Sequence, residues 1–285
     1  ITEKFRLHNA TQFFESFSEA SNSVYYMLLG KATPFTSATS GGTDASPPAP
    51  ADDVTSEFYT WDQTLIGKNI ASTDITYALP RRDWVNSTTF DMYEDNISSS
   101  NLSTSSSLYD ATFFFRTSDN RIYKVIDNNG GTAYSGSEPT SESTSLFAQG
   151  GYILKYIYTI TASEQTKFLT SDFMPVSTDS TISAAATDGK IESVIVTAGS
   201  GYTDGTYYVA VNGDGTNAGT SSGAIIGFTV SSNAIADFGL TSGTDTIVYN
   251  GGAAYTYGTV TLTDATVFSD VTLETAADSG DIDNG

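Results

Sequence analysis

The chain has 285 residues, of which 33 are acidic, 12 are basic and one is histidine, giving a formal net charge of -21. A field this negative repels phosphates, which disfavours nucleic acid and anionic lipid surfaces as partners. The absence of cysteine excludes disulfides, thiolate zinc sites and a cysteine nucleophile. The 39% hydrophobic and 12% aromatic content is enough to build a core, and abundant Thr, Tyr, Phe and Gly favour strands and turns. The composition therefore predicts a folded, mainly β protein.

The first predicted element is a short helix. A capping box with Asn9 as N-cap precedes Phe13, Phe14 and Phe17, which follow the spacing of one helical face. Two or three turns are marginally stable alone, so we expect this Phe face to pack on a sheet. Residues 24–29 then form an apolar run that predicts a fully buried strand. Such runs are far shorter than the roughly 20 residues that span a bilayer, so we expect no membrane insertion.

The middle of the chain predicts loops and antiparallel strands. Residues 38–53 and 96–107 are polar stretches without periodicity, which is typical of surface loops. The runs 109–116 and 121–126 flank four residues that tolerate tight turns, and this pattern predicts a hairpin. Residues 151–160 read as an aromatic-rich strand. This region is therefore expected to be a mainly antiparallel sheet structure with few helices.

Charge and glycine content change abruptly towards the C-terminal part of the chain. Lys190 is the last basic residue, and 11 of the 33 acidic residues follow it. Such a change marks a domain boundary. We place this boundary near residues 176–190 and therefore expect a mainly antiparallel β-domain at residues 1–176, an accessory β-domain at 177–275 and an acidic tail at 276–285.

The accessory domain is expected to consist of short strands between glycine-rich turns. Residues 201–206 and 254–259 match at an offset of about 53, which predicts a weak twofold repeat. The predicted strands are residues 191–196, 206–211, 224–230, 246–249 and 259–263.

Motifs that would carry chemistry are weak. A Ser-His-Asp triad has one possible base, His8, which lies in a polar stretch beside the first helix. Residues 199–205 superficially match a dinucleotide loop, but a strand rather than a helix follows them, so we interpret them as a β-turn. Residues 212–217 resemble an incomplete calcium loop, and adventitious calcium binding there stays open. We therefore predict no catalytic residues, no cofactor and no dedicated metal site.

The densest cluster of functional residue types is Arg81, Arg82, Asp83 and Trp84. Adjacent arginines in an acidic chain each need a carboxylate, and Arg and Trp are residue types that anchor interfaces. Two interpretations fit equally: an internal Arg–Asp network with Trp84 packed against a sheet, or a contact between subunits.

Several segments together resemble a known family. The order and spacing of these segments match that family. They are residues 4–6, the Phe-rich helix, the strand at 24–29 with the following 30–35, the run Ala78–Trp84 and the strand at 151–160. Over residues 1–176 the chain resembles a baseplate wedge subunit of T-even-like contractile-tailed bacteriophages, and Pro80–Trp84 is the most specific part of this resemblance. The resemblance implies a β-sandwich with a few peripheral helices that forms a homodimer, links other wedge proteins and has no catalytic activity.

The function expected from this resemblance is that of a structural subunit in the virion, at the tail baseplate, assembled in the host cytoplasm. Two alternatives remain open. Tail adhesins are also β-rich, acidic and rich in Gly, Ser and Thr, so a receptor-binding or glycan-binding tail module is the first. A polysaccharide-degrading tail enzyme is the second, because two acidic side chains at a suitable distance are sufficient for glycoside hydrolysis. Composition does not separate these classes.

Overall fold

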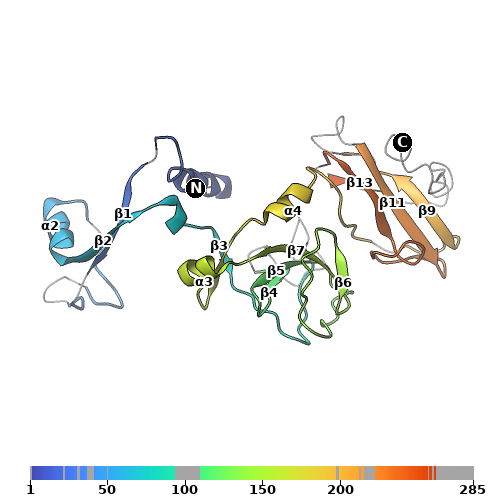
Figure 1. Cartoon of the computed structure of the whole chain (residues 1–285), viewed down its shortest axis with the longest axis horizontal. Coiled ribbons are helices and arrows are strands. Elements are labelled where there is room, and N and C mark those ends of the chain that lie inside the picture. Colours follow the sequence, from blue (N-terminus) through green and yellow to red (C-terminus); the bar gives the residue numbers. More distant parts are fainter. Residues whose placement is uncertain are drawn as a thin grey trace. The chain divides into compact units, whose positions relative to one another are not determined.

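The computed structural model describes residues 2–21, 23–30, 33–36, 42–49, 51–93, 110–196, 199–211, 213–214, 222–255, 257–258 and 260. In this part of the chain, antiparallel strands predominate and four short α-helices accompany them (Figure 1). The prediction of a mainly β, antiparallel fold with few helices is therefore confirmed. Contacts divide the chain into two units, Ile1–Tyr77 and Ala78–Gly285.

The first unit begins with helix α1 (Glu3–Glu15). Thr2 has extended backbone angles and is its N-cap, because the Thr2 hydroxyl accepts a hydrogen bond from the Phe5 amide at 3.4 Å. The prediction of Asn9 as the N-cap is wrong, since Asn9 lies inside a helix that Thr2 has already started. Phe17 lies just beyond the helix end and is buried.

Strands β1 (Tyr25–Gly30) and β2 (Thr64–Ile70) form a two-stranded antiparallel ribbon (Figure 1). Tyr25 lies opposite Ile70 in its register. Helix α2 (Val54–Gln63) leads directly into β2, and the 3-10 helix η1 (Ser72–Asp74) follows it. The predicted strand at 24–29 is confirmed, but its predicted burial is wrong. All of β1 beyond Tyr25 is exposed, because no third strand pairs with this ribbon among the described residues.

The second unit contains a four-stranded sheet in the order β4-β5-β7-β6. The hairpin prediction is confirmed by the antiparallel pairing of β4 with β5, and the predicted strand at 151–160 is β7. A small separate pair, β3 with β8, and helices α3 and α4 accompany this sheet. The bounds are β3 Ala78–Pro80, β4 Phe114–Arg116, β5 Arg121–Asp127, β6 Phe147–Gln149, β7 Tyr152–Thr159, α3 Ala162–Phe168, β8 Phe173–Pro175 and α4 Ser180–Ala185.

Aromatic side chains fill the core beneath this sheet. Tyr134 is fully buried and lies edge-on to Tyr152 and Trp84. Gly150 has a φ of +64°, and a Cβ there would collide with the Tyr134 ring. Close packing therefore requires glycine at this turn. The buried cluster comprises Phe90, Met92, Phe115, Tyr123, Val125, Tyr134, Tyr152, Leu154 and Tyr156.

A second sheet follows in the same unit. Its long strand β11 pairs with β9 on one side and with β12 and β13 on the other. The predicted strands at 206–211, 224–230 and 246–249 are confirmed. The bounds are β9 Gly205–Ala210, β11 Ser222–Ser231, β12 Ala234–Ile235 and β13 Ile247–Ala253, with a separate pair of β10 (Gly213–Asp214) and β14 (Tyr257–Gly258).

The predicted strand at 191–196 is wrong. Its backbone joins no ladder, although the Ile191 amide donates to the carbonyl oxygen of Gly251 at 2.9 Å. The side chains of Val194 and Val196 instead pack against two hydrophobic clusters. The β-branched side chains of this segment therefore fill the core, while its backbone does not pair with a strand.

The two larger sheets of the second unit share contacts. Ile126 and Ile153 of the first sheet cluster with Phe238, and Lys155 of β7 pairs with Glu192 at 2.8 Å. The boundary near residue 176 and the internal repeat stay predictions. The predicted loop at 96–107, most of the strand at 259–263, most of the calcium-like loop and the acidic tail lie outside the described residues.

Candidate interaction surfaces

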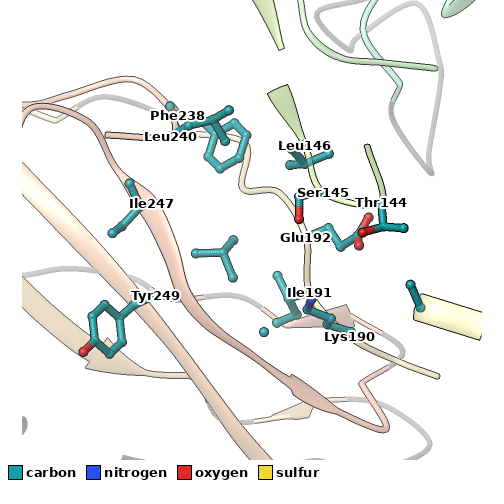
Figure 2. A pocket seen from close by; sticks show the side chains of 14 residues that line it. Thr144, Ser145, Leu146, Lys190, Ile191, Glu192, Phe238, Leu240, Ile247 and Tyr249 are labelled. Atoms are coloured by element: carbon teal, nitrogen blue, oxygen red, sulfur yellow. The ribbon is translucent and has the colours of Figure 1, made fainter. Parts of the chain in front are cut away.

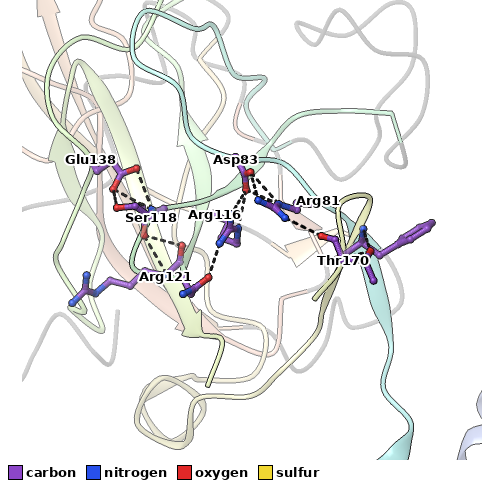
Figure 3. A network of polar contacts seen from close by, with 10 residues as sticks. Arg81, Asp83, Arg116, Ser118, Arg121, Glu138 and Thr170 are labelled. Atoms are coloured by element: carbon purple, nitrogen blue, oxygen red, sulfur yellow. Dashed lines mark hydrogen bonds and ion pairs between the residues drawn. The ribbon is translucent and has the colours of Figure 1, made fainter. Parts of the chain in front are cut away.

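Asp83 is the centre of a charged network in the second unit (Figure 3). Arg81 contacts both carboxylate oxygens of Asp83, with a shortest distance of 2.7 Å, and donates to the carbonyl oxygen of Thr170 at 2.9 Å. Arg116 of β4 donates from Nε to the same carboxylate at 2.8 Å and reaches Asn120 through Nη1. The network therefore joins the segment after β3 to the β4–β5 hairpin.

The electrostatics of this network follow from its hydrogen bonds. The bond from Arg81 holds the pKa of Asp83 below its ordinary value, and Arg116 adds to this while partial burial opposes it. The same bond raises the pKa of Arg81. The side chains of Arg81 and Arg116 are 27% and 11% exposed, whereas that of Asp83 is 42% exposed, so solvent screens part of the attraction.

The side chains of Arg82 and Trp84 make contacts outside the Asp83 network. Arg82 donates from Nη2 to the carbonyl oxygen of Asp110 at 3.1 Å. The Arg116 amide donates to the carbonyl oxygen of Arg82 at 2.7 Å, and the Trp84 amide donates to the carbonyl oxygen of Arg116 at 2.8 Å. These two bonds hold the segment alongside β4. Trp84 packs against the aromatic cluster with its ring centroid 5.7 Å from that of Tyr134.

The structure thus brings all four predicted residues together beside β4. Sequence reasoning missed Arg116, whose only signal was its place next to the hairpin turn. This geometry supports the internal-network interpretation, and a role of the cluster in an interface stays a prediction.

The first unit exposes many large apolar side chains, a surface that sequence reasoning missed. On α2, Phe58 and Trp61 are 72% and 68% exposed. On the ribbon, successive side chains alternate between its two faces, and exposed apolar side chains occur on both. Among the described residues of this unit, the exposed large apolar side chains are Phe5, Leu7, Phe13, Val24, Tyr26, Met27, Leu28, Leu29, Val54, Phe58, Trp61, Leu65, Ile66 and Tyr77.

Helix α1 covers one end of this ribbon. The ring of Tyr25 lies 4.5 Å from that of Phe17 and 5.3 Å from that of Phe13, and its hydroxyl is 2.9 Å from the Ser16 hydroxyl. The expectation that the Phe face packs on a sheet is therefore met at Tyr25. Phe13 nevertheless remains 57% exposed, so this contact leaves most of the apolar surface open.

A cavity of about 460 Å³ lies between the two sheets of the second unit (Figure 2). Phe238, Leu240 and Ile247 line its apolar side, while Glu192 and Ser145 lie at the polar side. Glu192 already accepts hydrogen bonds from Lys155 at 2.8 and 3.1 Å. This ion pair occupies the Glu192 carboxylate, which a polar ligand would need. We therefore interpret the cavity as a gap in packing beside the contact between the sheets.

The residues that the sequence offered as possible catalytic, nucleotide-binding or metal-binding motifs lie in the following places. His8 is exposed on α1. Gly205 begins β9, so residues 199–205 lead into a strand rather than a helix, as predicted. Across the described ranges, no group of three or more His, Asp or Glu side chains is arranged to hold a metal ion. No helix in these ranges has the length and apolar character of a membrane span.

The N-terminal part of the chain is similar to a structural protein of a T4-like phage baseplate. Residues 1–129 match the family Phage-Gp8, described as Bacteriophage T4, Gp8. The resemblance to a T4-like baseplate wedge subunit is thereby confirmed, and the match ends before residues 130–176, over which the resemblance was also expected. A search of curated proteins gave no match.

Proposed function

We propose that this chain is a structural subunit of a phage tail baseplate that links neighbouring proteins through protein–protein interfaces. The family match over residues 1–129 carries this proposal. It covers all of the first unit, where the exposed apolar side chains gather, as well as the Arg81–Trp84 segment. The part that matches thus contains most of the large apolar side chains that are exposed among the described residues.

The physical argument for assembly is the cost of leaving this surface in water. An isolated two-stranded ribbon is marginally stable, and large exposed apolar patches mark interaction sites. Stable interfaces bury upward of about 1,200 Å² and depend on aromatic and arginine anchors. Tyr26, Phe58 and Trp61 are anchors of this kind in the first unit.

The finer parts of the proposal are these. The chain acts without catalytic activity in a contractile tail, forms a homodimer, contacts other wedge proteins, and is assembled into virions in the host cytoplasm. The match to a family of baseplate structural proteins supports the non-enzymatic role.

The proposal is tested on purified tails of the phage that encodes the chain. We expect mass spectrometry to find the chain in tails in a fixed ratio to the other baseplate proteins, and sedimentation of the free chain to show a dimer at micromolar concentration. A chain that is missing from tails would contradict the proposal. Selective binding on a glycan array would instead favour a receptor-binding module, and turnover of oligosaccharides would favour a tail enzyme.

A further inference from the structure

Helix α2 presents an apolar stripe to solvent. Val54, Phe58 and Trp61 follow the i, i+4, i+7 spacing that places side chains on one helical face. Their exposed fractions are 69%, 72% and 68%. A surface helix normally turns such a face toward its own core, and Trp and Phe are residue types that anchor interfaces. The stripe therefore has the composition of a binding face.

The charges around this stripe favour one kind of occupant. Glu57 and Asp62 lie on α2 itself, and Asp52 and Asp53 directly precede it. No basic residue occurs between Lys31 and Lys68 in the sequence. A surface complementary to this helix is therefore apolar at its centre and basic at its rim.

A second copy of the chain fits this requirement poorly. It carries the same acidic surroundings and a net charge of -21, so two α2 helices would approach against like-charge repulsion. The nearest basic side chain after α2, Lys68, already pairs with Asp74 at 2.8 Å. A different protein supplies the needed charge more readily.

We propose that α2 docks into a groove of a different protein, with Phe58 and Trp61 as apolar anchors and Lys or Arg side chains of the groove facing Glu57 and Asp62. This is the helix-in-groove mode of recognition. It deepens the proposed function, on which it rests, by naming the face and the chemistry of its partner. Because α2 continues directly into β2, a partner bound here also fixes the end of the ribbon.

The occupant is identified by photo-cross-linking in assembled tails. A photoreactive phenylalanine analogue replaces Phe58, the phage is grown with this chain, and adducts in purified tails are mapped. We expect an adduct with a different protein, at an apolar site bordered by Lys or Arg. An adduct with a second copy of this chain, or no adduct although the chain is present in tails, would overturn the proposal.

Two sets of substitutions test the anchors and the charges separately. Phe58→Ser with Trp61→Ser, and Glu57→Gln with Asp62→Asn, should each lower incorporation into tails by about tenfold against wild type in competition. The matched controls are Val85→Ser, which alters an apolar side chain 56% exposed in the second unit, and Asp119→Asn, which alters an exposed carboxylate. Both controls should leave incorporation unchanged.

Unchanged incorporation of either double variant overturns the corresponding half of the proposal. All variants are exposed-site changes, and their melting temperatures should match that of the wild-type chain, which separates docking from folding. The proposed function fails separately if wild-type chain is missing from tails, whereas a chain present in tails with a dispensable α2 stripe overturns this inference alone.

Discussion

At the scale of single residues, Asp83 links stability to pH. Its pKa is depressed in the folded chain, first by the hydrogen bond from Arg81 and then by Arg116. The unfolded value is about 3.9. Stabilisation by the ionised carboxylate is therefore fully present above that value and is lost as pH falls through the lower, folded value.

We therefore expect Asp83→Asn to lower the free energy of unfolding at neutral pH by roughly 1 kcal/mol, a value discounted for the exposure of the carboxylate. The difference from wild type should shrink as pH falls below about 4. Urea unfolding at several pH values measures this. Asp119→Asn is the control, because Arg121 also pairs with Glu142 at 2.7 Å. A difference that persists unchanged into strong acid would contradict the account.

Gly150 tests packing at the same scale. It has a φ of +64°, and a methyl group there would overlap the buried Tyr134 ring. Gly130 has a φ of +63° with nothing near its missing Cβ, so it isolates the backbone cost. We expect Gly130→Ala to cost about 1 kcal/mol and Gly150→Ala roughly 3 kcal/mol or more. Chemical denaturation of both variants compares them, and equal costs would show that Tyr134 yields without penalty.

At the scale of elements, burial separates two kinds of strand pair. Most residues of β5 and β7 are buried, whereas most residues of β1 and β2 are exposed and none is buried. We expect amides of β1 and β2 to exchange with deuterium at least about 100-fold faster than those of β5 and β7 in the free chain. Exchange followed by mass spectrometry measures this. Equal protection would mean that the ribbon is already covered in solution.

Sequence patterns predicted strands well where side-chain pattern and backbone pairing agree. The run at 151–160 became β7 because its side chains are buried and its backbone pairs on both sides. The run at 191–196 also contains β-branched apolar residues, but its side chains pack against hydrophobic clusters while its backbone joins no ladder. The local pattern of residue types indicates whether a side chain is suited to the core. It does not indicate which other segment of the chain will pair with the backbone at that place.

The same limit explains the error at β1. An uninterrupted apolar run predicts a buried strand. Whether the strand is buried depends on which other elements pack over it, and these are distant in the sequence. The Arg81–Trp84 cluster could be predicted from residue types, since adjacent arginines in an acidic chain need partners. Arg116 could not, because its contact with Asp83 depends on how the hairpin is placed in the fold.

At the scale of the whole molecule, the two units differ in the size of their hydrophobic cores. The named hydrophobic clusters all lie in Ala78–Gly285. We expect a fragment of residues 78–285 to unfold in one cooperative transition close to that of the full chain, and a fragment of residues 1–77 to show no cooperative transition. Calorimetry of both fragments beside the intact chain decides this. A cooperative melt of the smaller fragment would show that the ribbon and its helices are self-sufficient.

In the described part of the chain, one edge of β1 pairs with no other strand, and this bears on how the free protein behaves at high concentration. Tyr25–Gly30 contains neither a charged residue nor a proline, which are the usual features that stop strands of separate molecules from joining edge to edge. The net charge of -21 supplies the missing protection, because whole molecules repel before their strands can meet. Light scattering should therefore rise when salt screens this repulsion, and again as the buffer approaches the pI of about 4.1, where the repulsion vanishes. A lysine in place of Leu28 should suppress both rises, so that one side chain does locally what the acidity of the whole chain does at a distance.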